Sequence, residues 1–332
     1  MALGEFALIE RFFGAPARAQ QHSRGDVALG IGDDAALLSV PAGRQLVAAL
    51  DTLVEGRHFL RGFPAASIGH RALAANLSDL AAMGAEPAWY LLALTIPAVD
   101  TGFLEEFARG MLALAAEHAV ALVGGDTTGG PLTISVQALG LVEPGAALRR
   151  DGGRAGDLLY VSGTPGDAAA GLQLALALAQ ATDAGVDTAH RQWLLHRFHY
   201  PEPRVALGRA LRGIASACID VSDGLAADAG KLAAASHCGV TIDVERLPLS
   251  ASLLAQAGPA GAVAQALGGG EDYELCFSVP PEHETQLTLA VAHLGHAVTR
   301  IGQLREAPGV TVLQHGRLLE FDARGFDHFA TG

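Results

Sequence analysis

A glycine- and arginine-rich stretch divides the chain into two halves, each of which alternates apolar runs with helical patterns. It runs from Glu143-Pro-Gly to Arg154-Ala-Gly-Asp157 and has the composition of a linker. Of the 332 residues, 50% are hydrophobic and only 17% are charged, so the chain can bury sizeable cores. That length is long for one core and suits two. We therefore expect two domains, residues 1–147 and 148–332.

In the first half, apolar runs predict strands and a 3.6-residue period predicts helices. Ser67 can cap a helix that continues towards Met83, where Gly84 and Pro87 end it. Large apolar residues at helical spacing predict a second helix over residues 103–114. The predicted strands are Val27–Leu29, Ala36–Val40, Leu46–Leu50, Trp89–Ile96, Ala121–Val123 and Leu132–Val142. Strand runs with inserted helices are typical of the α+β class.

The second half restarts this alternation after the linker. Thr164-Pro-Gly-Asp167 and Ser222-Asp223-Gly224 each open a predicted helix, and another helix follows Pro203. The predicted strands are Leu158–Val161, Ala217–Val221, Tyr273–Val279, Val298–Ile301, Val310–Leu313 and Leu318–Phe321.

Composition excludes several classes of partner. The net charge is −13 and Lys231 is the only lysine, whereas a nucleic-acid-binding chain needs many cations to displace counterions. The N-terminal segment carries Glu5 and lacks the basic region of a signal peptide, and apolar stretches such as Trp89–Ile96 are far shorter than the ~20 residues of a membrane helix. Three cysteines, none in a CxxC pair, suit a reduced compartment. We expect a cytoplasmic protein with neither nucleic acid nor membrane as a partner.

Several segments place an aspartate where a predicted strand gives way to a turn, and glycines flank most of them. A single such aspartate is more often a helix cap or a turn residue, but the set comes from distant parts of the chain. Glycine lets backbone approach a ligand closely, and Mg²⁺ binds carboxylates together with substrate phosphates. The set is therefore a candidate multi-magnesium phosphate site. The segments are Gly30-Ile-Gly-Asp33-Asp34, Leu50-Asp51-Thr52, Gly124-Gly-Asp126-Thr-Thr128 and Ile219-Asp220-Val-Ser222-Asp223-Gly224.

A fifth candidate, Asp79, lies on a predicted helix instead of at a strand end. It shares a helix face with Asn76, three residues earlier. The helix is otherwise apolar, and a carboxylate is costly to bury there without a partner. Asp79 is therefore a further candidate metal ligand.

The chain lacks the usual nucleotide-binding motifs. A Walker A loop needs Gly-Lys followed by Ser or Thr, but Lys231 precedes Leu232, and the protein-kinase HRD motif is missing as well. Nucleotide chemistry would therefore rest on metal ions, backbone amides and arginine. Arg149 and Arg150 are the candidate cations, although a solvated pair in the linker explains them equally well.

Two further segments are candidate ligand contacts. Gly268-Gly-Gly-Glu271-Asp272-Tyr273 holds more glycine and acid than a helix C-cap and turn require, which favours a contact with a ligand. His58 follows the Asp51 segment closely. A surface or core histidine is the default interpretation, and the neighbouring acidic segment modestly favours a functional one.

Together these segments resemble the thiamine-monophosphate kinase family, within the aminoimidazole ribonucleotide synthetase-like superfamily. The resemblance runs nearly end to end. Its motifs are Gly4-Glu-Phe6, Gly30-Ile-Gly-Asp-Asp34, the segment from Asn76-Leu-Ser-Asp79 to Glu86-Pro87, Gly124-Gly-Asp-Thr-Thr128, Thr164-Pro-Gly-Asp167, Asp220-Val-Ser-Asp-Gly224, Gly268-Gly-Gly-Glu-Asp-Tyr-Glu-Leu275 and Gly325-Phe-Asp-His-Phe329.

The resemblance implies a fold, a reaction and a set of site residues. The fold would be a two-domain α+β architecture, with an N-terminal sheet domain that binds ATP and Mg²⁺ and pairs in a homodimer, and a C-terminal α/β domain that completes the site. The reaction would be ATP plus thiamine phosphate giving ADP plus thiamine diphosphate. The implied Mg²⁺ ligands are Asp34, Asp51, Asp79, Asp126, Asp220 and Asp223. The implied ATP contacts are Gly125, Asp126, Arg150 and Ser222, the implied thiamine phosphate contacts are His58, Glu271 and Phe326, and Asp51, Asp126 and Arg150 would be catalytic.

The chain departs from the family pattern at one point and has rivals within the superfamily. The family often has Ser-Thr just before the Asp51 position, where this chain has Ala49 and Leu50, so any metal contact there would use backbone carbonyls. Selenophosphate synthetase relatives carry a reactive Cys or selenocysteine near the N-terminus, but no cysteine precedes Cys218 here. Hydrogenase-maturation relatives end in a functional Cys, which this chain lacks. A non-catalytic acidic metal-binding dimer is the alternative from another class.

Overall fold

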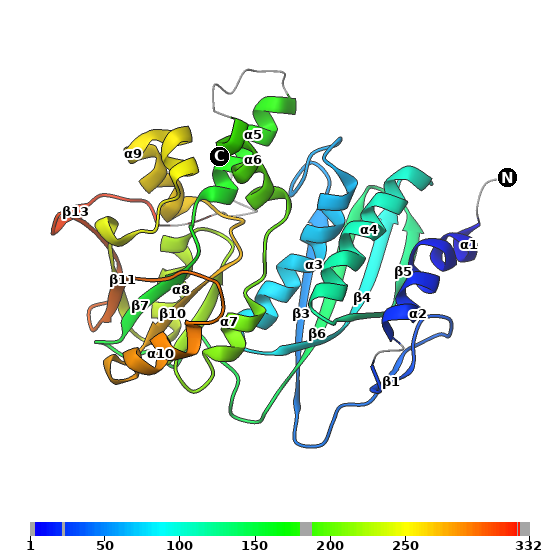
Figure 1. Cartoon of the computed structure of the whole chain (residues 1–332), viewed down its shortest axis with the longest axis horizontal. Coiled ribbons are helices and arrows are strands. Elements are labelled where there is room, and N and C mark those ends of the chain that lie inside the picture. The colour runs from blue at the N-terminus through cyan, green and yellow to red at the C-terminus, as the bar shows by residue number, and fades with distance from the viewer. Residues whose placement is uncertain (1–3, 22–23, 180–187, 324, 326–332) are drawn as a thin grey trace. The chain divides into compact units, whose positions relative to one another are not determined.

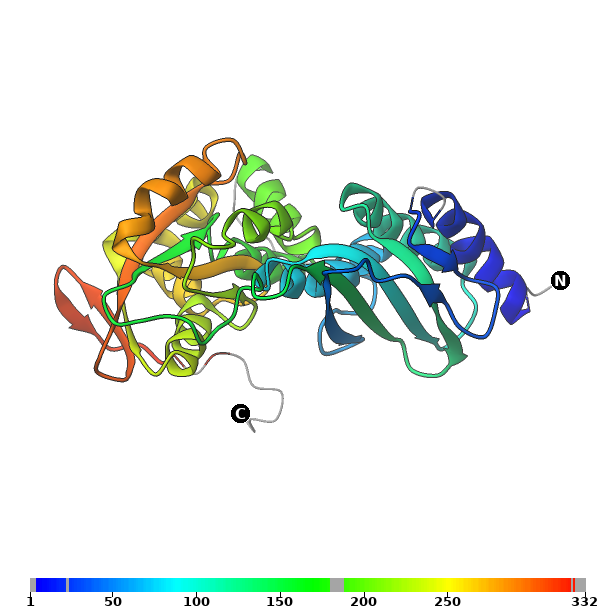
Figure 2. The ribbon, with the colours of Figure 1, turned by 90° about the horizontal axis from the view of Figure 1, so that it is seen from below.

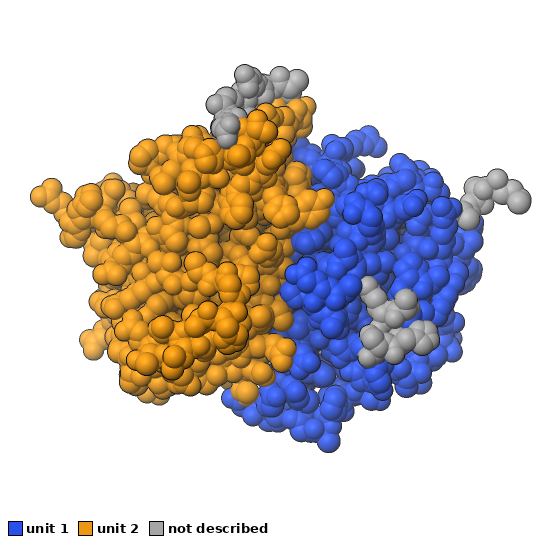
Figure 3. All heavy atoms as spheres, in the orientation of Figure 1, with its two compact units in different colours: residues 1–80, 85–145 blue, residues 81–84, 146–332 orange. Residues whose placement is uncertain are grey.

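The computed structural model describes residues 4–21, 24–179, 188–323 and 325. The chain forms two compact units (Figure 3). The first comprises residues 1–80 and 85–145, and the second comprises residues 81–84 and 146–332. In the part of the chain described, no helix is both long and apolar enough to cross a lipid bilayer.

A four-stranded sheet in the order β3-β6-β4-β5 forms the centre of the first unit. β6 is antiparallel to β3 and β4, and β4 is parallel to β5. The helices α3 and α4 cover one face of this sheet (Figures 1 and 2). Val27 of β1 and Leu38 of β2 pack against a separate core of this sheet, which contains Trp89 and Leu139. The strands are β1 (Val27–Leu29), β2 (Leu37–Leu38), β3 (Gln45–Val54), β4 (Glu86–Ile96), β5 (Ala121–Gly129) and β6 (Thr133–Val142).

Local signals explain where the helices of this unit begin and end. Asp100 caps α4 by accepting hydrogen bonds from the N–H groups of Gly102 and Phe103, at 2.9 and 3.1 Å. α3 starts two residues before Ser67, so the predicted cap at Ser67 is wrong. The Ser67 hydroxyl instead donates to the Pro64 carbonyl, at 2.8 Å. The helices are α3 (Ala65–Ala82) and α4 (Thr101–Glu117), preceded by α1 (Glu5–Ile9), a π-helical turn (Glu10–Gly14) and α2 (Ala15–Gln21).

The second unit contains a seven-stranded sheet in the order β13-β12-β9-β11-β7-β10-β8. All neighbours are antiparallel except β12 and β9. Every residue of β7, β8 and β10 is buried, because helices lie on both sides of the sheet (Figure 2). The strands are β7 (Leu158–Ser162), β8 (Ala217–Val221), β9 (Gly239–Asp243), β10 (Glu274–Val279), β11 (Val298–Arg305), β12 (Gly309–Gln314) and β13 (Arg317–Leu319). The helices are α5 (Asp167–Ala179), α6 (Thr188–His199), α7 (Val205–Ala210), α8 (Leu225–Ala235), α9 (Ala251–Gly268) and α10 (Glu284–Val291), with 3₁₀ turns at Val244–Arg246 and Pro281–His283.

Strand direction brings three loops of the second unit to one end of its sheet. β10 is antiparallel to both β7 and β8, so the carboxyl ends of β7 and β8 lie beside the amino end of β10. The loop after β7, the turn after β8 and the glycine-rich loop before β10 therefore meet there.

Candidate functional site

The turn after β8 and the glycine-rich loop before β10 lie in backbone contact. The N–H of Glu271 donates to the carbonyl of Ser222, and the N–H of Tyr273 donates to the carbonyl of Val221, both at 2.9 Å. A Cβ atom on Gly270 would lie 2.4 Å from the Ser222 carbonyl oxygen. The glycine there thus permits close backbone packing. The structure brings together two predicted site residues, Ser222 and Glu271.

A buried carboxylate and the chain's lysine hold the turn after β8. Asp228 Oδ2 accepts hydrogen bonds from the N–H groups of Ser222 and Asp223, each at 3.0 Å. Lys231 Nζ donates to Asp228 Oδ1 at 2.8 Å and also to Asp223 Oδ2. Burial raises the pKa of Asp228 above its ordinary value, and the Lys231 charge opposes this. The predicted metal ligand Asp223 is therefore ion-paired with the lysine.

Behind the glycine-rich loop, Asp272 joins this loop to the start of α5. Its carboxylate accepts hydrogen bonds from the N–H groups of Gly166 and Ala168, at 2.7 and 3.2 Å. Burial raises the pKa of Asp272 to about 8, although both hydrogen bonds favour the carboxylate. Asp272 was not among the predicted site residues, because its partners are 106 and 104 residues away in the chain.

Glu274, the first residue of β10, lies in a fully buried ion cluster. Its carboxylate accepts a hydrogen bond from Arg197 at 2.6 Å, two from Arg204 at 2.7 and 2.6 Å, and one from the Ser162 hydroxyl at 2.5 Å. Burial opposes ionisation, but the two guanidinium groups hold the pKa of Glu274 below its ordinary value. This cluster fixes the end of the glycine-rich loop from inside the unit.

The two candidate arginines of the linker differ in their contacts. The Arg149 guanidinium is paired with Asp151 at 2.5 Å. Arg150 is exposed, and its guanidinium makes no hydrogen bond or ion pair within the described residues. The Cys218 N–H donates to the Arg149 carbonyl, which places this segment at the amino end of β8. The backbone of Arg150 therefore lies near the opposite end of β8 from Ser222.

In the first unit, Asp51 and Asp126 lie inside strands and not at strand ends, so that prediction is wrong. β3 pairs with β6 along its whole length, which places Asp51 opposite Val136. β5 continues past its glycines, and Asp126 pairs with Ala93 of β4. β3 and β5 are opposite edges of the sheet, separated by three strand spacings or about 14 Å. With Mg–O distances of about 2.1 Å, one ion could not bind both carboxylates within one copy.

The other predicted residues of the first unit are spread over its loops and α3. Asp34 is exposed in the loop between β1 and β2, and Asp79 is partly buried on α3. His58 follows β3, and its Nδ1 accepts a hydrogen bond from the Val54 N–H at 3.0 Å, which leaves Nε2 as the protonated nitrogen. Across the described residues, no three His, Cys, Asp or Glu side chains form a group that could hold a metal ion.

Two further predicted residues, Asp220 and Phe326, belong to β8 and to the C-terminal segment. Asp220 lies in β8 and is 5% exposed. Phe326 lies outside the described residues. Gly325 is described, and a Cβ atom on it would lie 3.3 Å from the Asp223 carbonyl oxygen. The chain therefore passes the turn after β8 immediately before Phe326.

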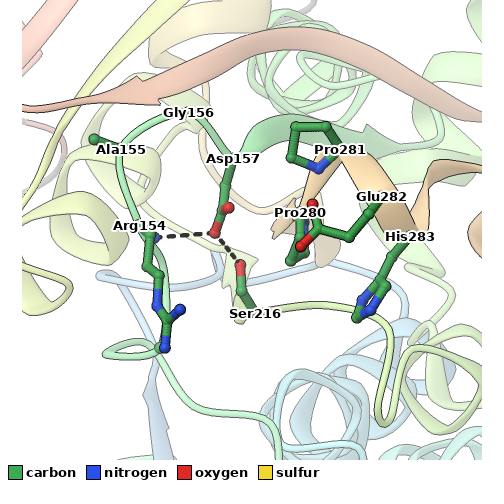
Figure 4. Close-up of a pocket in the computed structure, with 10 residues that line it drawn as sticks. Arg154, Ala155, Gly156, Asp157, Ser216, Pro280, Pro281, Glu282 and His283 are labelled. Atoms are coloured by element: carbon green, nitrogen blue, oxygen red, sulfur yellow. Dashed lines mark hydrogen bonds between the residues drawn. The ribbon is translucent and has the colours of Figure 1, made fainter.

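A pocket lies at the other end of the second sheet (Figure 4). In its wall, the Ser216 hydroxyl and the Arg154 N–H donate to Asp157 Oδ2, at 2.5 and 2.9 Å. Glu282 and His283 line the opposite side. None of the predicted site residues lines this pocket, so it is separate from the loops at the carboxyl end of β8.

Two family models match the chain. The model for the N-terminal domain of AIR synthase related protein matches residues 32–142, and the model for the C-terminal domain matches residues 154–314. The thiamine-monophosphate kinase of Escherichia coli strain K12 is 47% identical over 335 residues, which cover 100% of both chains.

Solved structures agree with these matches. The crystal structure of thiamine-monophosphate kinase from Stenotrophomonas maltophilia K279a has a TM-score of 0.85 and 47% identity, covering 94% of this chain and 97% of that one. AaThiL complexed with AMPPCP and TMP has a TM-score of 0.77 and 32% identity, with 99% of each chain covered.

Proposed function

The chain belongs to the thiamine-monophosphate kinase family, and we propose that it transfers the γ-phosphoryl group of ATP to thiamine phosphate by a magnesium-assisted route. The products are thiamine diphosphate and ADP, and the activity is a step of thiamine biosynthesis. The observation that best supports this is the end-to-end similarity to AaThiL, which was solved with an ATP analogue and TMP. The free buried cysteines suit a cytoplasmic enzyme.

Mg²⁺ is the metal that best suits the donors of this chain. Asp34 and Asp126 are exposed carboxylates, and the Asp126 carboxylate makes no hydrogen bond or ion pair with a described residue. Mg²⁺ typically takes only one or two protein carboxylates and fills its remaining positions with water and substrate phosphates. Separate carboxylates are therefore compatible with Mg²⁺ even where no group of three exists. The proposed ligands are Asp34, Asp51, Asp79, Asp126, Asp220 and Asp223.

When bound, Mg²⁺ neutralises the repulsion between two anionic substrates and holds them in line. The acceptor is a phosphate oxygen, which is already anionic near neutral pH, so the chain needs no general base. Ser222 is a suitable ATP contact because its N–H and carbonyl are engaged, while its hydroxyl makes no hydrogen bond to the described residues. Arg150 offers an unengaged guanidinium for a phosphate. Gly125 and Asp126 are the remaining proposed ATP contacts.

Thiamine phosphate is proposed to contact His58, Glu271 and Phe326. His58 is a suitable donor, because its Nδ1 accepts from the backbone and Nε2 carries the proton. Glu271 stands next to the engaged Asp272, with a backbone φ of 71°. A positive φ is uncommon for a non-glycine residue. In this scheme the first unit binds ATP and Mg²⁺, and the second completes the phosphate and acceptor site.

A homodimer is part of this proposal. Leu46 and Leu50 are four residues apart in β3, so their side chains point to the same face of the sheet. They are 48% and 65% exposed, so this face presents apolar side chains that a second copy can cover. The separation of Asp51 and Asp126 on opposite sheet edges also favours a site that uses two copies. In sedimentation analysis, Leu50→Asp should shift the protein towards a monomer, and Leu318→Asp, at another exposed leucine, should leave it unchanged.

The direct test is an ADP-release assay with ATP and Mg²⁺, paired with detection of thiamine diphosphate. Thiamine phosphate, thiamine and no acceptor are compared. We expect release that depends on thiamine phosphate and falls by orders of magnitude in Asp126→Asn. Equal ADP release without an acceptor, or none with thiamine phosphate, would refute the proposed reaction.

A further inference from the structure

The two tryptophans of this chain have opposite environments. Trp89 is fully buried in the first unit, whereas Trp193 on α6 is 47% exposed. Trp193 Nε1 donates to Asp167 Oδ2 at 2.8 Å. Because the polar edge of the indole is already satisfied, the exposed part is the apolar ring.

The Trp193 anchor is unusually rigid for an exposed side chain. Asp167 is fully buried, and it also accepts hydrogen bonds from the hydroxyls of Thr164 and Ser250, at 2.7 and 2.5 Å. Two hydroxyl donors besides the indole therefore fix the carboxylate that holds the indole. A ring fixed in advance loses little conformational entropy when a ligand packs on it.

The anchor also lies next to the glycine-rich loop. Asp272 binds the N–H groups of Gly166 and Ala168, the two neighbours of Asp167. One helical turn after Trp193, on the same face of α6, Arg197 binds Glu274 at 2.6 Å. This face of α6 is thus attached, directly and through the start of α5, to the two acidic residues that follow Glu271.

We propose that the exposed indole face of Trp193 is a stacking surface for a positively charged heteroaromatic ring of the phosphorylated acceptor. This rests on the proposed function, in which Glu271 contacts that acceptor. Tryptophan is the aromatic side chain that attracts cations most strongly, and a thiazolium ring combines a flat face with a positive charge. Trp193 would then help the enzyme to select thiamine phosphate over phosphates without an aromatic cation.

Fluorescence offers a direct test, because each tryptophan can be removed in turn. In Trp89→Phe, Trp193 is the only tryptophan, and saturating thiamine phosphate should quench its emission. In Trp193→Phe, which retains Trp89, the emission should not respond. Titration with inorganic phosphate should leave both variants unchanged. Absence of quenching in Trp89→Phe, while that variant turns over thiamine phosphate, would overturn the proposal and leave the proposed reaction intact.

Steady-state kinetics separate stacking from simple anchoring of α6. Trp193→Ala should raise KM for thiamine phosphate about tenfold and leave KM for ATP unchanged. Trp193→Phe keeps an aromatic ring but loses the hydrogen bond to Asp167, so its KM for thiamine phosphate should be close to that of wild type. Leu178→Ala, at another half-exposed side chain on α5, is the matched control and should behave as wild type. If Trp193→Phe and Trp193→Ala raise the KM for thiamine phosphate equally and both lower the melting temperature, Trp193 only anchors the helix.

Discussion

At the scale of single residues, Lys231 would compete with the proposed Mg²⁺ for Asp223. Its ammonium group contacts the carboxylate proposed to bind Mg²⁺, so the ion has to displace it. A half-exposed ion pair of this kind contributes roughly 0–1 kcal/mol, which limits the effect to a few-fold.

We therefore expect Lys231→Met to bind Mg²⁺ about two- to fivefold more tightly than wild type, measured by calorimetry without nucleotide. Lys231→Arg, which keeps the charge, is the control and should stay close to wild type. Weaker metal binding in Lys231→Met would indicate that the lysine instead orders the turn through Asp228.

The buried Asp272 predicts a pH dependence of stability. Burial raises its pKa from 3.8 to about 8, so the folded protein binds a proton that the unfolded chain releases between these values. Stability from this group is fully present below pH 3.8 and is lost as the pH rises towards 8, by at most about 1.4 kcal/mol per pH unit. Urea unfolding between pH 5 and 8 should show this slope in wild type and a flatter one in Asp272→Asn. If wild type and Asp272→Asn lose stability with pH at the same rate, the pKa of Asp272 is not raised in the folded protein.

At the scale of elements, the strand bounds predicted from the sequence are correct where an apolar run is continuous. They are too short where backbone pairing extends a strand beyond its apolar run. β8 has the predicted bounds, Ala217–Val221, because each residue is apolar or buried. β3 runs on through Asp51 because the neighbouring β6 supplies hydrogen-bond partners to its end. A polar residue does not end a strand whose backbone stays paired.

The parts of the site that were missed depend on contacts between distant segments. Ser222, Asp223 and Glu271 lie in motifs that the sequence singles out, and their roles in binding stay predictions. Arg197 is 77 residues from Glu274, on a helix for which no prediction was made. Nothing local in a sequence indicates such a pair, whereas the predicted α+β class and two-domain fold family depend on patterns that run along the whole chain and are confirmed.

The Glu274 cluster should control the position of the whole glycine-rich loop. Glu274→Gln removes the charge that two buried guanidinium groups share, and breaking such a buried pair costs about 3 kcal/mol or more. We expect a lower midpoint in urea unfolding and a higher KM for thiamine phosphate. Glu202→Gln, which removes an exposed partner of Arg204, should change neither. A KM that is unchanged despite lower stability would show that the loop is held by other contacts.

At the scale of the whole molecule, the placement of β3 and β5 at opposite edges of one sheet has a genetic consequence. If each site combines Asp51 of one copy with Asp126 of another, Asp51→Asn and Asp126→Asn enzymes are each inactive alone. In a mixed dimer, however, one site receives both substitutions and the other receives neither. The two defective alleles should therefore complement each other when co-expressed.

Unfolding and refolding the two inactive proteins together provides the measurement. Random reassortment gives half of the dimers as mixed species, each with one intact site, so about a quarter of the wild-type activity should return. Mixing Asp51→Asn with the double variant Asp51→Asn/Asp126→Asn is the control and should return none. Recovery in the first mixture would mean that two different loss-of-function copies of this gene, expressed in one cell, can together restore an active enzyme that neither copy provides alone.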